Sequence, residues 1–333
     1  MDTAPVPGND SQRIRITVVI PTRNRSELLQ RTLRGVREQT SKPHEVLVID
    51  DGSSNEEKSA NAALIKQFSA DNYLHVYNAG NGSGASAVRN IGLAMASGDW
   101  IIFCDDDDYW CDPKFLELAT RAIADKVDLI FANQRAHNPD GTLAYDVWQP
   151  GLLKRIAYKC SEPDQVVALS RTECLAETGT FAHLNTSLFR TSFLRELGGF
   201  WPLVRYSEDQ DLYVRAIDRA SGVRYINRTV SVHSRPNRIL KENEQTRTGE
   251  NEKLLTLVLI ANHLTNQCGT AQAQDYARRL GSYACKKLAR SAFQAGIYQK
   301  AVTWAQVASG WSRSWKWSLY TVYLMLRTAR TRA

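Results

Sequence analysis

Over the first 130 residues, short apolar runs rich in β-branched residues alternate with stretches of helical periodicity. The strand-like runs are Ile16–Ile20, Glu45–Ile49, Leu74–Tyr77 and Trp100–Cys104. The helical stretches start near Ser26, Glu56 and Ala85, the first with Ser26 as its expected cap. This β-α-β-α-β-α-β order predicts an α/β fold with a mainly parallel, doubly wound sheet.

The rest of the chain changes character twice. From about residue 130 to 235 strand and helix signals are mixed, with Asn138–Gly141 as a predicted hairpin tip. From about residue 250 onward the pattern is helical throughout. We therefore expect a disordered segment at 1–13, a main domain at 14–240 and a C-terminal helical region at 241–333.

The composition is that of an ordinary globular protein, with 43% hydrophobic and 23% charged residues among 333. No apolar run approaches the roughly 18 to 20 residues of a transmembrane helix. Met1–Arg15 has no apolar signal core, so we expect a cytoplasmic protein. The six cysteines form no CxxC pair and no zinc-site spacing, which favours reduced, mostly buried thiols.

Positive charge is concentrated at the C-terminal end. Residues 270–333 contain eleven Lys or Arg and a single acid, Asp275, which gives +10; because the whole chain carries +7, the remainder carries −3. Four of the eight tryptophans lie in the same segment. A uniformly basic nucleic-acid-binding domain has a different distribution, so we expect no nucleic-acid partner.

Three predicted strands end in polar motifs. These are Pro21-Thr22-Arg23-Asn24, Asp50-Asp51-Gly52-Ser53 and Asp105-Asp106-Asp107-Asp108. Doubly wound sheets bind their ligands at the C-terminal ends of the strands. The three motifs should therefore converge on one crevice.

The run Asp105–Asp108 suggests metal chemistry. Four adjacent carboxylates repel one another, and a hard cation such as Mg²⁺ or Mn²⁺ relieves that repulsion through oxygen ligands. Such an ion usually binds substrate phosphates as well. The alternative is a solvated acidic turn before the helix that starts near Asp112.

Three further features have both a structural and a functional interpretation. Glu208-Asp209 is either an N-terminal helix cap or a general base facing the crevice. Gly80–Gly84 and Arg89 fit either a phosphate or sugar contact or a surface loop and helix face, since the glycine spacing does not match GxGxxG. His233 is either a structural residue or a metal or phosphate ligand.

Five motifs together resemble family 2 glycosyltransferases with the GT-A fold. They are Thr17–Arg25 (TVVIPTRNR), Val48–Ser53 (VIDDGS), Ala87–Gly92 (AVRNIG), Phe103–Trp110 (FCDDDDYW) and Glu208–Leu212 (EDQDL). Their order and spacing over about residues 14–235 make the resemblance specific. It implies a GT-A catalytic domain at 14–240, with a nucleotide-sugar-binding half at 14–110 and an acceptor-binding half at 111–240.

The resemblance also implies an inverting enzyme that moves a sugar from a nucleotide-diphosphate donor, usually UDP-linked, to a saccharide, lipid-linked or envelope acceptor. The residues that correspond to the family's donor-binding set are Pro21, Thr22, Arg23, Asp51, Arg89, Asp105 and Asp106. Asp105 and Asp107 are the outer residues of the DxD metal motif, with Asp107 as the direct ligand of Mn²⁺ or Mg²⁺. Asp209 corresponds to the catalytic base. The chain departs from the family pattern at Cys111-Asp112-Pro113, which leaves the register beyond Trp110 open.

Two other function classes remain as alternatives. A non-catalytic nucleotide-sugar-binding protein has no need of a base, so Asp209 argues against it. An aspartate- and Mg²⁺-dependent phosphohydrolase requires its nucleophile after the first strand, where this chain has Pro21-Thr22-Arg23.

Residues 312–333 combine an apolar helical face with basic residues. The apolar face consists of Trp315, Leu319, Val322, Tyr323 and Leu326. Aromatic residues favour the bilayer interface and basic residues are drawn to anionic lipid, so we expect a peripheral helix on the inner face of a membrane. A dimer-forming or self-packed helix is the alternative. Upstream, Trp304, Val307 and Trp311 predict a helix packed on the catalytic domain.

Overall fold

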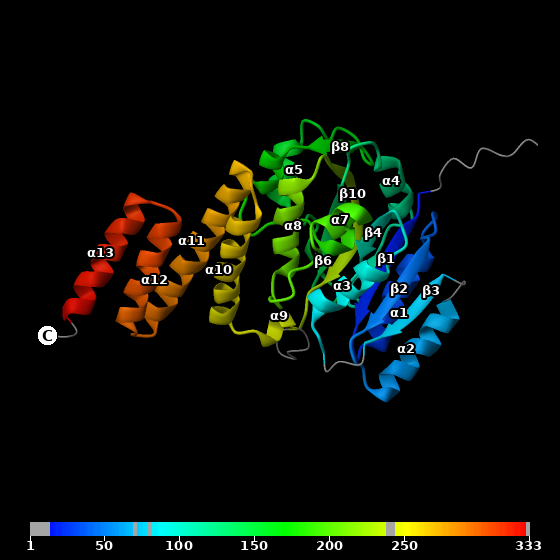
Figure 1. Cartoon of the computed structure of the whole chain (residues 1–333), viewed down its shortest axis with the longest axis horizontal. Helices are drawn as coiled ribbons and strands as arrows, with labels where there is room; N and C mark the ends of the chain where they lie inside the picture. The colour runs from blue at the N-terminus through cyan, green and yellow to red at the C-terminus, as the bar shows by residue number, and fades with distance from the viewer. Residues whose placement is uncertain (1–13, 69–71, 79–81, 238–243, 331–333) are drawn as a thin grey trace, which may run out of the picture.

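The computed structural model describes residues 14–68, 72–78, 82–237 and 244–330 (Figure 1). The segment 1–13, expected to be disordered, lies outside the described residues, as do Gly80 and Asn81 of the predicted glycine-rich loop and residues 331–333 of the basic tail. The strands and helices predicted for the first 130 residues are confirmed.

The first 103 residues contain four parallel strands. β1 (Ile16–Thr22) lies between β2 (Glu45–Asp50) and β4 (Trp100–Phe103), and β3 (Tyr73–Tyr77) extends the sheet beyond β2. The connecting helices are α1 (Ser26–Arg37), α2 (Asn55–Phe68) and α3 (Ala85–Met95). β1, β2 and β4 are buried on both faces, which is why their sequences are continuous apolar runs.

Helix α1 does not use the predicted cap. Arg25 occupies the N-cap position, but its side chain does not cap the helix, and Ser26 is the first helical residue. The backbone N–H of Ser26 instead donates to Glu57 Oε2 of α2 at 2.9 Å. A tertiary contact therefore replaces the local one.

Beyond β4 the sheet becomes mixed, with the strand order β3-β2-β1-β4-β9-β6-β10-β5. The further strands are β5 (Tyr109–Trp110), β6 (Leu129–His137), β7 (Leu143–Tyr145), β8 (Val166–Leu169), β9 (Ser187–Arg190) and β10 (Val223–Ser234). The short helices between them are α4 (Phe115–Ala122), α5 (Pro150–Ile156), α6 (Arg171–Leu175), the 3₁₀ turn η1 (Leu184–Thr186) and α7 (Thr191–Glu196), and the longer α8 (Glu208–Arg219) precedes β10. β9 runs antiparallel to β4 and β6, whereas β10 is parallel to β6. The predicted turn at Asn138–Gly141 joins β6 to the antiparallel β7, as expected for a hairpin.

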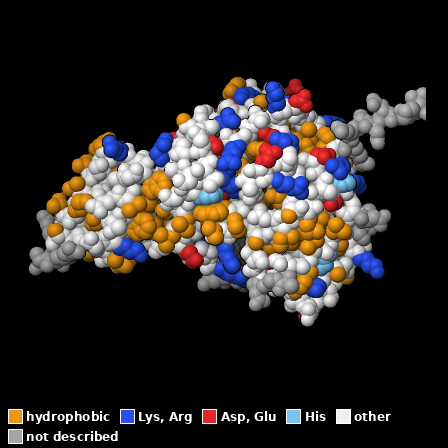
Figure 2. Space-filling view, in the orientation of Figure 1, with side chains coloured by type: hydrophobic (Ala, Val, Ile, Leu, Met, Phe, Trp, Pro, Cys, Tyr) orange, Lys and Arg blue, Asp and Glu red, His pale blue; other side chains and the backbone are white. Residues whose placement is uncertain are grey.

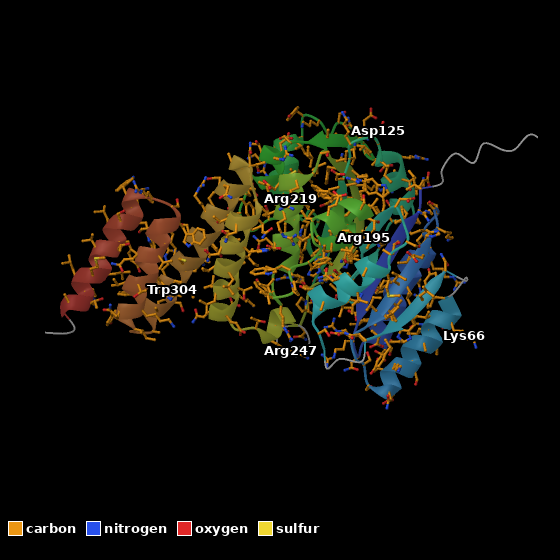
Figure 3. All side chains as sticks on the ribbon, viewed as in Figure 1. Lys66, Asp125, Arg195, Arg219, Arg247 and Trp304 are labelled. Atoms are coloured by element: carbon orange, nitrogen blue, oxygen red, sulfur yellow. The ribbon has the colours of Figure 1, made fainter. Side chains whose placement is uncertain are left out.

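Two apolar layers cover opposite faces of the sheet. One contains Val19, Leu47 and Phe103 beneath α3, α7 and α8, and the other contains Val18 and Val48 beneath α1 and α4. Arg195 of α7 (Figure 3) joins α7 to the C-terminal end of α3 in the first layer, because its Nη2 donates to the carbonyls of Leu93 and Ala96 at 2.9 and 2.6 Å. The strand ends that carry the polar motifs are thus held rigidly from both sides.

The C-terminal helices form a row that leads away from the sheet (Figure 1). They are α9 (Glu244–Arg247), α10 (Glu250–Gln267), α11 (Ala271–Gln294), α12 (Tyr298–Trp311) and α13 (Trp315–Arg330). α10 and the first half of α11 contribute to the first apolar layer of the sheet, whereas the second half of α11 forms a separate core with α12 and α13. In the described ranges, no helix is both long enough and apolar enough to cross a bilayer.

The expected packing of α12 on the catalytic domain is wrong in part. α12 packs against α11 through a face of small residues that includes Ala301, Ala305 and Ala308, and Val307 is 39% exposed. Trp304 (Figure 3) belongs to the C-terminal core. The small residues allow the two helices to approach closely, so the alanine face is buried in place of the Val307 position.

Candidate active site

The four aspartates after β4 have different surroundings, and Asp108 is the anchor of the run. It is fully buried, and its Oδ1 accepts from the backbone N–H of Ser234 at 2.7 Å. Its Oδ2 accepts from the side-chain amide of Asn185 and lies 3.0 Å from His233 Nδ1. Thr32 Oγ1 donates to the carbonyl of Asp108 at 2.6 Å. The acidic loop is therefore fixed to α1, η1 and β10.

Asp106 contacts the end of β1. Thr22 Oγ1 donates to Asp106 Oδ2 at 2.8 Å, and Arg25 Nη1 lies 3.0 Å from Asp106 Oδ1 and 3.2 Å from Asp107 Oδ2. Burial raises the pKa of Asp106, and Arg25 and Thr22 offset only part of that effect. Two residues predicted to bind the donor, Thr22 and Asp106, are thus in direct contact.

Asp107 is the least compensated acid of the run. Burial, followed by the charges of Asp108, Asp106 and Asp105, raises its pKa to about 8, while Arg25 acts in the opposite direction. A quarter of its side chain is exposed. The neighbouring carboxylates therefore disfavour its ionised form, and a bound cation would relieve that repulsion.

Arg89 joins the acidic loop to the start of α8. Its Nη2 lies 2.5 Å from Asp105 Oδ1 and its Nη1 lies 2.8 Å from Glu208 Oε1, and the side chain is only 6% exposed. Burial acts to raise the pKa of Asp105, but the guanidinium outweighs it and the pKa lies below its usual range. One cation therefore holds together two acidic segments that are 103 positions apart in sequence.

Asp209 is the second residue of α8. The N-cap is Ser207, in the left-handed region with a φ of 57°, so Asp209 does not occupy the capping position. Within the described chain its carboxylate accepts one hydrogen bond, from the backbone N–H of Gln210 at 2.8 Å. Burial and the adjacent Glu208 raise its pKa to about 7, against the influence of Arg89. A half-buried carboxylate with this pKa exchanges protons readily near neutrality.

Asp51, at the end of β2, holds the described part of the glycine-rich loop. Its Oδ1 accepts from Asn78 Nδ2 at 2.9 Å and from the N–H of Ser83 at 3.0 Å, and its Oδ2 accepts from the N–H of Gly84 at 3.0 Å. Gly84 has a φ of 90°, a conformation that other residues rarely adopt. The carboxylate thus organises the loop in addition to any contact with a ligand.

The end of β1 lies beside this loop. Pro21 pairs with Ile49 in the parallel ladder, and the carbonyl of Thr22 accepts from the N–H of Asp51 at 2.9 Å. Arg23 is exposed, and a Cβ added to Gly82 would collide with its guanidinium. Pro21, Thr22, Arg23 and Asp51 therefore lie together, as the strand-end argument predicted.

An aromatic and histidine cluster borders the acidic loop on the β10 side. The ring of Trp148 lies edge-on, 5.1 Å from that of His183 and 5.2 Å from that of His233. Burial acts to lower the pKa of His233, but Asp108 raises it to about 9. Burial and the neighbouring His233 lower the pKa of His183 to about 4. His233, whose role the sequence left open, is a partner of the acidic loop.

Two groups of described side chains have potential ligand atoms within 4.8 Å of one another: Asp105, Asp107 and Asp108, and Asp108, His183 and His233. The first group offers oxygen atoms only, which suits Mg²⁺ or Mn²⁺. Asp108 already accepts hydrogen bonds at both oxygens, so Asp107 and Asp105 are the residues better placed to hold an ion.

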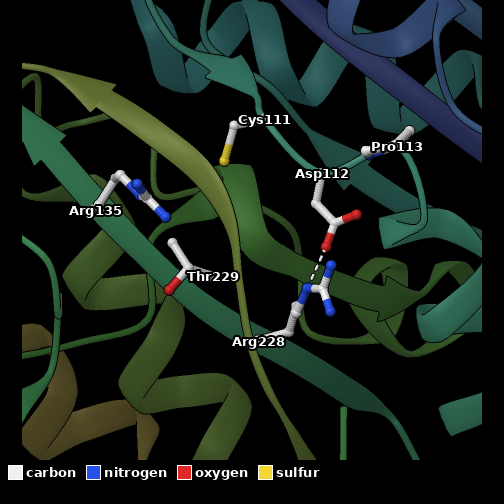
Figure 4. A pocket seen from close by; sticks show the side chains of 6 residues that line it. All are labelled: Cys111, Asp112, Pro113, Arg135, Arg228 and Thr229. Carbon is white, nitrogen blue, oxygen red and sulfur yellow. Dashed lines mark hydrogen bonds and ion pairs between the residues drawn. The ribbon is translucent and has the colours of Figure 1, made fainter. Parts of the chain in front are cut away.

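A separate cavity of about 470 Å³ is lined by Cys111, Asp112, Pro113, Arg135, Arg228 and Thr229 (Figure 4). Arg228 pairs there with Asp112 at 2.5 Å and also with Asp164 at 2.9 Å, so its charge is offset. None of the residues predicted to act in catalysis lines this cavity.

The sequence analysis missed several supports of the site, namely Arg25, Thr32, His183 and Asn185. Arg25 stands inside the TRNR motif, and that position is the one signal that could have indicated it. Asn185 contacts Asp108 across 77 positions, a relation that no local pattern contains.

Comparison with known proteins shows the family of this chain. Residues 17–230, well over half of the chain, match the model of glycosyl transferase family 2. A segment of 94 residues is 35% identical to the GalNAc(5)-diNAcBac-PP-undecaprenol beta-1,3-glucosyltransferase of Campylobacter jejuni, covering 28% of this chain and 30% of that protein. The chain spans less than two fifths of the length of the first curated relatives that it matches.

Solved structures show the same fold. The chain resembles S. aureus TarS 1–349 in complex with UDP-GlcNAc, with a TM-score of 0.63, 16% identity, and coverage of 90% of this chain and 80% of TarS 1–349. It also resembles the mannosyltransferase PcManGT of Pyrobaculum calidifontis, in complex with GDP-Man and Mn²⁺, with a TM-score of 0.56, 19% identity, and coverage of 100% and 83%. At these identities the likeness concerns the fold alone, and the predicted GT-A fold class is confirmed.

Proposed function

We propose that this chain, which belongs to glycosyl transferase family 2, is a glycosyltransferase that inverts the anomeric carbon of a UDP-linked sugar in a metal-assisted direct displacement. Residues 14–110 form the donor half of the proposed catalytic domain and 111–240 the acceptor half, with residues 241–333 as a helical extension. Catalysis is assigned to Asp209, metal binding to Asp107 and Asp105, and donor binding to the strand ends around Asp51.

The observation that carries the proposal is the bridge made by Arg89. Its contacts with Asp105 and Glu208 join the loop proposed to bind metal to the first turn of α8, which supports the proposal that both act on one substrate. The family resemblance implies that Arg89 contacts the donor, but its ion pairs with Asp105 and Glu208 instead support a role in setting the separation of these two acids. A direct displacement requires that the acceptor oxygen, the anomeric carbon and the leaving group be aligned, and fixed separation supplies that alignment.

Asp209 accepts the proton of the acceptor hydroxyl. Its single hydrogen bond within the described chain leaves lone pairs for a substrate, and its pKa of about 7 matches a base that works near neutral pH. A direct displacement forms no covalent enzyme intermediate, so no Ser or Cys nucleophile is required. The buried Cys104 fits this, because burial raises the pKa of its thiol well above the usual value.

The acidic loop fits a divalent ion. Its oxygen-only donor set suits Mn²⁺ or Mg²⁺, and such an ion would relieve the repulsion between Asp107 and the neighbouring acids. Bound by Asp107 and Asp105, such an ion would offset the charge on the diphosphate leaving group. The Mn²⁺ named with PcManGT supports the same choice.

A screen of UDP-, dTDP- and GDP-sugars for Mn²⁺-dependent thermal stabilisation, followed by nucleotide release with the stabilising donor, tests the proposal. We expect a UDP-sugar to stabilise the protein and to release UDP in wild type but not in Asp209→Asn. Stabilisation without any release would favour the non-catalytic binding protein. Release of inorganic phosphate through a phosphorylated aspartate would favour the phosphohydrolase.

In this proposal the Asp51 carboxylate accepts a hydrogen bond from the uracil N–H of the donor. Asp51→Ala should raise the dissociation constant for UDP, because it removes the carboxylate acceptor and releases the loop that it holds. Asn78→Ala is the matched control, since it removes the hydrogen bonds of the Asn78 amide to Asp51 and Ser83 and leaves the Asp51 carboxylate in place. If both variants weaken UDP binding equally, Asp51 acts only through the loop.

The acceptor is a saccharide, lipid-linked or envelope molecule, and helix α13 supports a membrane location. Its buried face consists of Trp317, Thr321, Leu324 and Thr328. Its opposite face is apolar but exposed: Trp315 is 71% exposed, Leu319 63% and Leu326 62%. Figure 2 shows hydrophobic side chains at the surface over the C-terminal helices.

Three basic residues, Arg313, Lys316 and Arg327, lie near this exposed apolar face in the sequence. The combination suits a peripheral contact with anionic lipid on the inner face of the cell membrane. The undecaprenol in the name of the Campylobacter relative is consistent with an acceptor at that surface.

Vesicle binding tests the membrane contact. Substituting Trp315, Leu319 and Leu326 with Ser in the full chain should abolish binding to vesicles that contain phosphatidylglycerol at low salt. Ser318→Gln, also exposed on α13, is the control and should bind as wild type does. If wild type ignores these vesicles and forms dimers that the triple variant cannot form, the apolar face is instead a contact between copies.

A further inference from the structure

The first turn of α8 has two sets of polar side chains with different neighbours. Glu208 contacts Arg89 beside the acidic loop. Gln210 and Asp211, which are 2% and 0% exposed, contact the C-terminal helices α10 and α11. In Figure 1 these helices lie next to α8, on the side away from the sheet.

Asp211 is held between two elements. Its Oδ2 accepts from Arg215 Nε at 2.8 Å, and its Oδ1 lies 2.7 Å from His263 Nδ1 of α10. The ring of His263 stacks on that of Trp201, with centroids 3.9 Å apart and an interplanar angle of 12°. Trp201 begins the segment that leads into α8, so His263 fixes both the first turn of the helix and its approach.

Arg215 holds the same approach from the other side. Its Nη1 donates to the carbonyl of Leu197 at 3.0 Å and its Nη2 to that of Gly199 at 2.8 Å. Arg215 therefore links the segment between α7 and α8 to the Asp211 carboxylate by hydrogen bonds. His263 contacts the same segment by stacking on Trp201.

A second contact comes from α11. Gln210 Nε2 donates to the hydroxyl of Tyr276 at 2.7 Å, and the N–H of Gly179 donates to the same hydroxyl at 3.2 Å. Tyr276 is fully buried. The residue after the proposed base is thus hydrogen-bonded to a rigid phenol that is itself fixed by another loop.

We propose that α10 and α11 position the catalytic base, with His263 and Tyr276 as positioning residues that fix the first turn of α8. The inference rests on the proposed role of Asp209. Both residues lie beyond residues 17–230, the part that matches the family model. A base must reach the acceptor hydroxyl within hydrogen-bond distance, and a misplacement of about 1 Å costs on the order of 10²-fold in rate.

The far end of α8 offers a matched control. Asp218 Oδ1 accepts from Thr270 Oγ1 at 2.6 Å, and Arg219 (Figure 3) donates from Nη2 to the carbonyl of Gln267 at 3.2 Å. These contacts also join α8 to the α10–α11 pair, but they lie nine or more residues after Asp209. Thr270→Ala therefore loosens the same helix pair away from the base.

The test compares His263→Ala, His263→Asn, Tyr276→Phe and Thr270→Ala in the full-length protein. The readouts are kcat and KM with the donor found by screening, binding of UDP with Mn²⁺, and hydrogen exchange of the backbone amides of 208–212. We expect His263→Ala to lose about 10-fold in kcat, with KM and UDP binding unchanged, and to exchange faster at 208–212. His263→Asn, whose amide can occupy the place of Nδ1, should recover most of the loss.

Equal kcat and equal exchange at 208–212 in His263→Ala and Thr270→Ala would overturn the positioning role. If His263→Ala does not fold, Tyr276→Phe carries the same comparison, because it removes only the hydroxyl. Asp209→Asn separates this inference from the proposed function. If Asp209→Asn turns over as wild type does, the base assignment itself is wrong; if it is inactive while His263→Ala matches Thr270→Ala, only the positioning role is wrong.

Discussion

The two short acidic runs, Asp105–Asp108 and Glu208–Asp211, have similar surroundings in the folded protein. In each run one acid is fully buried and hydrogen-bonded on both oxygens, Asp108 in the first and Asp211 in the second. In each run one acid is paired with Arg89. One acid in each run keeps a raised pKa: Asp107 at about 8 and Asp209 at about 7.

The runs differ in what supports them. Asp108 is held by α1, η1 and β10, all close to or within the region that matches the family model. Asp211 is held partly by α10, which lies beyond it. The loop proposed to bind metal is therefore held by the sheet and the helices that cover it, whereas the first turn of α8, which carries the proposed base, is also held by a C-terminal helix.

The largest effect on activity should come from removing Asp107, the acid with the raised pKa in the first run. Asp107→Ala should lower transfer by about 10³-fold or more and abolish Mn²⁺-dependent UDP binding, because the ion loses its direct ligand.

The pKa of Asp107 in the fold is about 8, above the usual value of about 4, so its ionisation destabilises the fold as pH rises between those values. Without metal, the Tm of the variant should therefore exceed that of wild type at pH 8 and approach it near pH 4. Retained Mn²⁺-dependent binding would end the metal assignment.

Removing Arg89, which pairs with one acid of each run, should destabilise the fold at both runs. Arg89→Met leaves Asp105 and Glu208 without their partner in a buried setting, which we expect to cost about 3–5 kcal/mol in the free energy of unfolding. Urea denaturation measures this loss. Adding Glu208→Gln to Arg89→Met should restore part of it, because one unpaired charge is removed; no restoration would mean that Glu208 does not depend on Arg89.

Replacing the proposed base tests the second run. Asp209→Asn should reduce kcat by roughly 10²-fold or more while UDP binding is unchanged, since the amide cannot accept a proton. In wild type kcat should rise with pH through about 7 as Asp209 loses its proton, and the variant should lack that rise. A matching loss of UDP affinity would instead indicate that Asp209 supports the structure of the site.

The smallest effect is expected for Glu208→Gln. The amide oxygen can still accept from Arg89, so the change in kcat should stay below about 10-fold, and steady-state kinetics beside Asp209→Asn provides the comparison. An effect as large as that of Asp209→Asn would reverse the roles of the two acids.

The sequence by itself determined the order of β1 to β4, because strands buried on both faces form continuous apolar runs and helices between them keep a period of 3.6 residues. It also indicated which strand ends meet, since the C-terminal ends of parallel strands lie at one edge. Thr22, Asp51 and Asp106 were predicted on that ground to lie together, and they do. Asp209 was proposed through the resemblance of its motif.

Only the tertiary structure decided how the acids of each run are divided. Four consecutive aspartates are chemically alike in sequence. Burial distinguishes them, as do the contacts of Arg89 with Asp105 and of Asn185 with Asp108, which span 16 and 77 positions. The same holds for His263 and Tyr276, which belong to a helical region whose sequence shows only periodicity. Periodicity records which face of a helix is buried, but the polar partner of a buried side chain depends on how separate elements pack, and that information is not local.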